Sequence, residues 1–242
     1  MREVRDDRTP TAVSVSRGKI RVDMHTHCEA SPDSRTPLAE QARAVRAAGL
    51  DVVCATDHNT IDGALRLREM ADGFRVIVGE EVSSRDGELI GLFLERPVPR
   101  GLSGEETIAR IRDQGGLVVV PHPFSRNRRY HIRRDALDRL LTSIDALEVF
   151  NAREAFSGDN RRAAAYARER GLVGAAGSDA HRVAEVGRAF VEMRDFAGRA
   201  DFLDALRDGV VHGRLSGTRV HLLTRYDRLR KWLGRKRSSA AR

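Results

Sequence analysis

Five short motifs place histidine, aspartate and glutamate at the ends of apolar, β-branched segments, and five of the eight histidines lie inside them. The motifs are Asp23-Met24-His25-Thr26-His27, Thr56-Asp57-His58, Gly79-Glu80-Glu81, Pro121-His122-Pro123 and Gly177-Ser178-Asp179-Ala180-His181. Imidazole and carboxylate ligands without thiolates are typical of reactive Mn, Fe or Zn sites and not of structural zinc sites. The motifs therefore predict a metal centre.

The number of candidate ligands points to more than one ion. His25 and His27 in extended chain present both imidazoles on one face, because side chains alternate. Asp33 follows His27 by six residues. The candidate ligands are His25, His27, Asp33, His58, Glu81, His122, Asp179 and His181. Eight are too many for one ion, so we expect two or three divalent ions (Mn, Fe or Zn), bridged by a carboxylate such as Glu81.

Each motif also has an ordinary structural explanation. Asp57 and His58 precede a predicted helix and could form its N-terminal cap, and Asp179 could cap a turn. Glu80-Glu81 could lie in a solvated turn, and His122 in a loop between two prolines. All five motifs follow or close predicted strands, however, and that coincidence favours a shared metal site.

The segments that must position the motifs alternate between strand and helix. The predicted strands span residues 19–23, 51–56, 74–78, 88–94, 117–120, 146–150, 172–176 and 189–193, and the predicted helices span 37–49, 60–70, 103–114, 134–141, 159–170 and 200–208. Thr36 is expected to cap the first helix, and Ser103 with Glu106 to form a capping box. Short connections imply parallel strands in βαβ units, so we expect an α/β barrel with the motifs at its C-terminal rim.

Three regions are expected along the chain: a disordered segment at 1–17, one barrel domain at 18–213 and a basic amphipathic tail at 214–242. The tail holds ten of the 43 basic residues but one of the 35 acidic ones, so the net charge of +8 belongs to it. Leu222, Tyr226, Leu229 and Leu233 follow helical spacing there. Packing of this helix on the barrel is the simplest expectation, and contact with nucleic acid or an anionic membrane surface is the alternative.

Composition excludes several classes of protein. Hydrophobic residues make up 40% and charged residues 32%, which is typical of a folded globular chain. No apolar run is long enough for a membrane span. Cys28 and Cys54 are the only cysteines, so a disulfide framework is not expected. With no apolar leader segment, we expect a cytoplasmic protein.

Across residues 21–194 the chain resembles the PHP family, named for polymerase and histidinol phosphatase. The DxHxH, TDH, GxE, PHP and SDAH signatures occur in the family's order. The resemblance implies a distorted (β/α)7 barrel in a single α/β domain, with a di- or trinuclear metal centre at the C-terminal ends of its strands. It also implies metal-dependent phosphoesterase activity.

Carried over by motif, the resemblance implies the same eight ligands, with Glu81 as the bridge because it directly precedes Val82. One departure concerns the sixth strand, where many members have a further His or Cys. Here the stretch 148–153 contains neither. Asn151 could be a weak oxygen ligand or a hydrogen-bond donor to a ligand. We therefore expect two tightly bound ions, with a third ion weakly bound or absent.

The expected reaction is hydrolysis of a small phosphomonoester, such as a nucleotide or a histidinol-phosphate-like compound, by a metal-activated water. Arg153 and Arg182 follow strand ends and are expected to bind phosphate oxygens; Arg126, Arg128 and Arg129 are further candidates. We expect Asp57 to act with Arg153 and Arg182 in catalysis by orienting a ligand imidazole, and Asp23 to orient one as well.

Two other functions remain open. One is an exonuclease or nucleoside-bisphosphate phosphatase that acts on RNA or DNA ends and contacts nucleic acid through the basic tail. The other is a non-catalytic metal-binding scaffold. The sequence leaves the oligomeric state undecided.

Overall fold

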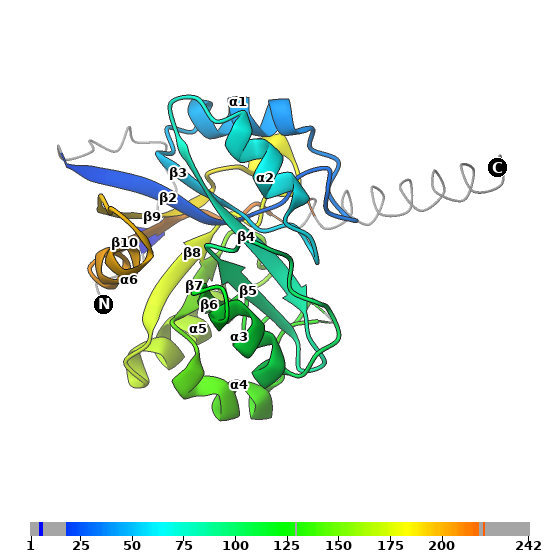
Figure 1. Cartoon of the computed structure of the whole chain (residues 1–242). Helices are drawn as coiled ribbons and strands as arrows, with labels where there is room; N and C mark the ends of the chain where they lie inside the picture. Colours follow the sequence, from blue (N-terminus) through cyan, green and yellow to red (C-terminus); the bar gives the residue numbers. More distant parts are fainter. Residues whose placement is uncertain (1–4, 7–17, 129, 218–219, 221–242) are drawn as a thin grey trace.

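A single twisted sheet, covered by helices, forms the body of the protein (Figure 1). The computed structural model describes residues 5–6, 18–128, 130–217 and 220. Within these residues the strand order is β1-β10-β9-β2-β3-β4-β5-β6-β7-β8. The strands are β1 (Arg5–Asp6), β2 (Lys19–Thr26), β3 (Val52–Ala55), β4 (Arg75–Ser83), β5 (Glu88–Leu92), β6 (Leu117–Val120), β7 (Ala146–Asn151), β8 (Val173–Gly177), β9 (Ala189–Arg194) and β10 (Val210–Gly213).

Strands β2 to β8 form a nearly closed ring, which confirms the expected barrel. The chain leaving β8 returns to the end of β2, where the His27 N–H donates to the Ala180 carbonyl at 2.9 Å and the Asp179 N–H donates to the His25 carbonyl at 2.7 Å. The first half of β2, Lys19 to Val22, instead pairs with β9. β2 therefore belongs both to the ring and to the β9–β10 extension beside it.

Strand direction differs from the sequence-based expectation in two places. β5 runs antiparallel to both β4 and β6, and β9 runs antiparallel to both β2 and β10. Only a polar turn separates Ser83 from Glu88. A parallel connection needs a crossover of roughly a dozen residues, so this turn can only make a hairpin. Strands β1 and β10 were not predicted.

Helices cover the ring at opposite ends of the view in Figure 1, with α1 and α2 at one end and α3 to α5 at the other. The helices are α1 (Leu38–Ala47), α2 (Asp62–Glu69), α3 (Gly104–Arg112), α4 (Arg134–Leu140), α5 (Ser157–Glu169) and α6 (Arg199–Arg207), with short 3-10 turns η1 (Leu141–Ser143) and η2 (Val183–Glu185).

The two predicted caps have different outcomes. The capping box at Ser103 is confirmed, because the Glu106 N–H donates to the Ser103 hydroxyl and the Ser103 N–H donates to Glu106 Oε2. Thr36 does not cap α1, because the N-cap residue is Pro37 and no side chain caps the helix. The Thr36 hydroxyl donates to the His181 carbonyl at 2.9 Å, so it ties α1 to the last metal motif instead.

The chain ends are only partly described. Arg5 and Asp6 pair with β10, and the rest of the segment 1–17, which the sequence analysis expected to be disordered, lies outside the described residues. The expected amphipathic tail helix also lies outside them, apart from Val220. Among the described helices, none has the length and apolar character that crossing a bilayer requires.

Candidate metal centre

The structure brings all eight predicted ligands to one rim of the barrel. His25 lies near the end of β2 with His27 just beyond it, and Glu81 lies in β4. His122 follows β6, and Asp179 and His181 follow β8. Asp33 and His58 come from the loops after β2 and β3. All are buried except His58, whose side chain is 14% exposed.

Glu81 lies at the centre of the cluster. Its Oε2 is 3.2 Å from His25 Nε2, 3.3 Å from His27 Nε2 and 3.3 Å from His58 Nδ1. Its Oε1 is 2.9 Å from His122 Nε2. The two oxygens of one carboxylate thus face different imidazoles, which is the arrangement that a bridging ligand requires.

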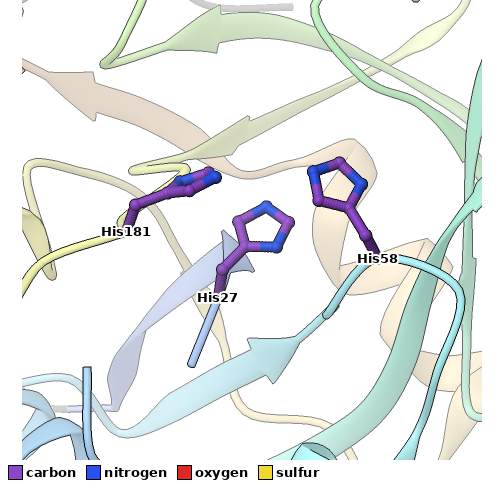
Figure 2. A group of neighbouring side chains, drawn as sticks. All are labelled: His27, His58 and His181. Carbon is purple, nitrogen blue, oxygen red and sulfur yellow. The ribbon is translucent and has the colours of Figure 1, made fainter. Parts of the chain in front are cut away.

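A second side of the cluster is formed by His27, His58 and His181, whose rings converge from three separate segments (Figure 2). Their ligand atoms lie within 4.8 Å of one another. Asp33 closes this side, with Oδ2 3.5 Å from His58 Nε2 and Oδ1 3.2 Å from His181 Nε2. Asp179 joins it to the first side, because Oδ1 is 3.3 Å from His181 Nδ1 and 3.8 Å from His25 Nε2.

Glu88 is a further metal-centre residue that the sequence analysis missed. It forms a potential ligand group with His58 and Glu81, and its oxygens lie 3.7 Å from His58 Nδ1 and 3.8 Å from His122 Nε2. Glu88 is the first residue of β5 and pairs with Ser83. Because β5 is antiparallel, its first residue reaches the rim at which the parallel strands end. The short turn between β4 and β5 is the sequence signal that could have identified Glu88, because a turn of this length makes a hairpin.

Backbone conformation at the rim is specialised. His122 has φ of 30° and Asp179 has φ of 51°, in the left-handed region that non-glycine residues seldom occupy. Such conformations cost about 1–3 kcal/mol each and cluster at functional sites. Two of the predicted ligands therefore adopt unfavourable backbone conformations that the surrounding structure must support.

The donor set fits divalent cations. Asp179 Oδ1 is buried, faces the imidazoles of His25, His27 and His181, and has no hydrogen-bond partner within the described part of the chain. A buried carboxylate oxygen left in this state is costly unless a cation meets it. Mixed nitrogen and oxygen ligands of this kind suit Mn, Fe or Zn.

Among the groups of the cluster, His58 and Glu88 have pKa values shifted upward by their surroundings. Burial alone would lower the pKa of His58, but the carboxylates of Glu81 and Asp33 outweigh burial and raise it to about 10. Burial, together with the neighbouring Glu81 carboxylate, raises the pKa of Glu88 to about 8. By contrast, burial and the Arg153 guanidinium lower the pKa of His181 to about 3, so this imidazole is neutral.

A network behind the ligands fixes their orientation. Glu148 Oε1 is 3.2 Å from His25 Nδ1, and Glu148 Oε2 accepts the His122 N–H at 2.7 Å. Asn151 Nδ2 donates to Glu148 Oε2 and to Asp179 Oδ2. An acceptor at Nδ1 leaves Nε2 of His25 free to bind a metal. These contacts make Asn151 a donor to ligands rather than an oxygen ligand.

Asp57 and Asp23 bind backbone and thiol groups, which corrects the expectation that they orient imidazoles. Asp57 Oδ1 accepts the Cys28 N–H at 2.7 Å, and Asp57 Oδ2 accepts the Cys28 thiol at 2.8 Å. Asp23 accepts the N–H groups of His25, Ser178 and Gly187. Both carboxylates hold the chain beside the ligands, because they lie behind the strand ends and not among the rings.

The two arginines expected to bind phosphate differ in position. Arg153 is buried against the centre, with Nη1 donating to His181 Nδ1 and to the Asp179 carbonyl, and with Nε 3.2 Å from Glu185 Oε1. Arg182 directly follows His181 and immediately precedes η2, where it is half-buried. Arg153 thus contacts the predicted ligands His181 and Asp179.

Sequence comparison identifies two relatives from one organism. The chain is 37% identical over 146 residues to the uncharacterised protein MJ1587 of Methanocaldococcus jannaschii, which covers 55% of this chain and 82% of that relative. It is 34% identical over 181 residues to the uncharacterised protein MJ0417 of the same organism, covering 73% and 71% of the two chains. A family model described as PHP-associated matches residues 158–211.

Structural comparison agrees on the fold. A two-domain protein from Bacteroides vulgatus, described as containing a PHP-like metal-dependent phosphoesterase, superposes with a TM-score of 0.67 at 16% identity, covering 88% of this chain and 70% of that one. PsfC from Pseudomonas syringae gives a TM-score of 0.66 at 20% identity, covering 88% and 98% of the two chains. With the family match, the barrel and the five signatures in order, the chain belongs to the PHP family.

Proposed function

We propose that the protein is a metal-dependent phosphoesterase that hydrolyses a small phosphomonoester, such as a nucleotide or a histidinol-phosphate-like compound. The observation that carries this proposal is the convergence of eight His, Asp and Glu side chains at one rim of the barrel, with Glu81 at their centre and all but His58 buried. The phosphoesterase description of the Bacteroides vulgatus protein, which shares this fold, supports it.

Bound divalent ions would supply an activated water and would neutralise charge on the phosphoryl oxygens. The side chains that would hold them are the eight predicted ligands with Glu88. Glu81 is suited to bridge ions, because its two oxygens face different imidazoles. Glu148 keeps the Nε2 atom of His25 available as a ligand by occupying Nδ1. Arg153, which contacts His181, and Arg182, which follows His181 in the chain, would supply positive charge for the phosphate.

Release of inorganic phosphate by Mn-loaded protein tests this function. The substrate panel would hold nucleoside monophosphates, a nucleoside bisphosphate, histidinol phosphate and short 5′-phosphorylated RNA. An Asp179→Ala variant that folds normally is the inactive control, because it removes the carboxylate that joins the two sides of the cluster. Release from one or two small monoesters, abolished in this variant, is the expected result.

Other outcomes would redirect the proposal. Release only from RNA or from the bisphosphate would favour the nuclease-type function. Metal binding without hydrolysis of any substrate would favour a metal-binding scaffold. Hydrolysis that persists in Asp179→Ala would contradict the role of the cluster.

A further inference from the structure

Arg128 reaches the metal centre from the loop between β6 and α4. It follows β6, and its Nη2 donates to Asp179 Oδ2, after β8, and to Asn151 Oδ1, at the end of β7, the latter at 3.3 Å. The other oxygen of the same Asp179 carboxylate faces the imidazoles of His27 and His181. The guanidinium therefore contacts one of the predicted ligands, Asp179, on the side that faces away from the imidazoles.

The donors of Arg128 are not used up by these contacts. Both hydrogen bonds come from Nη2, and Nε is buried without a partner in the part of the chain that the structure describes. Leaving a buried donor unpaired costs about 1–3 kcal/mol. A ligand that brings an anionic oxygen to this position would remove that cost, and guanidinium groups match phosphate oxygens in a planar fork.

Burial distinguishes Arg128 from Arg153. The Arg153 side chain is 4% exposed and is enclosed by Glu185, His181 and Asp179, whereas the Arg128 side chain is 18% exposed. A guanidinium stays protonated in proteins, so Arg128 carries its positive charge beside the Asp179 carboxylate. Arg153 is enclosed by these groups, whereas part of the Arg128 side chain remains exposed.

The number of phosphate oxygens then gives Arg128 a specific role. A terminal phosphate has three non-bridging oxygens and two negative charges, while a diester has two such oxygens and one charge. If two oxygens face divalent ions, a monoester leaves one anionic oxygen for the guanidinium. At that position a diester would present an esterified oxygen, which is a poor partner for a charged donor.

We propose that Arg128 binds the third non-bridging oxygen of a terminal phosphate and makes the site selective for phosphomonoesters over phosphodiesters. This inference rests on the proposed phosphoesterase function. It names a specificity-determining residue distinct from Arg153 and Arg182.

Paired substrates with the same leaving group test it: p-nitrophenyl phosphate and bis(p-nitrophenyl) phosphate, with Mn-loaded full-length protein. Arg128→Gln is expected to lower kcat/KM for the monoester by about 100-fold, the range seen when one charged donor to a transition state is removed. The diester should change by less than about 10-fold. Arg128→Lys keeps the charge beside Asp179 but loses the fork, and should give an intermediate loss for the monoester alone.

Arg134→Gln is the matched control, because Arg134 is exposed and pairs with Asp138 on its own helix. It should leave both substrates unchanged. Bound Mn is measured for every variant, since Arg128 contacts the predicted ligand Asp179. If Arg128→Gln loses Mn, Arg128→Lys with wild-type Mn content decides the test. A monoester-to-diester ratio that stays at the wild-type value in that variant overturns the proposal.

Calorimetric titration of inorganic phosphate into Mn-loaded protein separates this inference from the proposed function. Wild-type protein should bind phosphate, and Arg128→Gln should bind it about 10- to 100-fold more weakly. If the wild type hydrolyses neither substrate, the proposed function fails while this titration still judges Arg128. Equal phosphate affinity in the two proteins, or no binding by either, would refute the role of Arg128.

Discussion

Gly177 lies directly against His25. A Cβ atom on Gly177 would come within 2.3 Å of the His25 Cβ and 2.9 Å of Glu148 Oε1, closer than real side chains approach. The end of β8 can therefore pass over the first ligand only because this position lacks a side chain. Ser178 and Asp179 follow at once, so the same close approach delivers Asp179 to the cluster.

Gly177→Ala is expected to displace His25 or the Asp179 loop, because the new methyl group meets backbone and buried side-chain atoms. Overpacking of this kind costs about 1–3 kcal/mol of stability. Bound Mn after dialysis and the midpoint of urea unfolding would measure the effect. Gly198→Ala is the matched control, since its Cβ would meet no atom within 4 Å. Wild-type Mn content in Gly177→Ala would argue against this account of the close approach.

How much the sequence could predict depended on whether the signal was local. The strand Leu117–Val120 and the capping box at Ser103 were predicted correctly, because an apolar run and two side chains three residues apart specify them. Seven of the eight clustered residues were found because their motifs follow or close such a run, and Asp33 was found by its spacing from His27. Pairings between distant segments carry no comparable signal. The strand Val210–Gly213 exists through its pairing with β9, and Thr36 donates to the distant His181.

Glu88→Gln tests whether Glu88, which the sequence analysis missed because β5 was expected to be parallel, is a metal ligand. Glu88 is the first residue of an antiparallel strand, so it faces His58 and His122 at the rim. Replacing an anionic oxygen with a neutral amide should weaken the ion held on that side while the remaining ligands stay in place. Elemental analysis after dialysis should show fewer ions per chain than in wild type. Glu95→Gln, remote from the centre on the chain after β5, should retain the wild-type number; equal ion content in Glu88→Gln would exclude Glu88 as a ligand.

Asp57→Asn separates a structural role from a catalytic one. Both Asp57 oxygens accept hydrogen bonds from Cys28, whose thiol stays protonated because burial and the Asp57 carboxylate raise its pKa. The amide NH2 that this substitution introduces would face either the Cys28 N–H or the Cys28 thiol, and two donors facing each other would cost about 1–3 kcal/mol. We expect a lower urea midpoint with metal content and kcat close to wild type. The exposed Asp62→Asn should change neither, and a large loss of kcat without loss of stability in Asp57→Asn would restore a catalytic role.

Metal binding should weaken as pH falls, because ions and protons compete for the same ligands. The pKa of His58 is about 10 without metal, since Glu81 and Asp33 outweigh burial, so this imidazole carries a proton at neutral pH. Binding must displace that proton, and affinity should rise by roughly tenfold per pH unit for each proton displaced. Competition with a chromophoric chelator at pH 6, 7 and 8 measures the slope. His58→Gln should lower the slope by about one displaced proton. An unchanged slope in His58→Gln, or affinity independent of pH in wild type, would show that metal binding displaces no proton from His58.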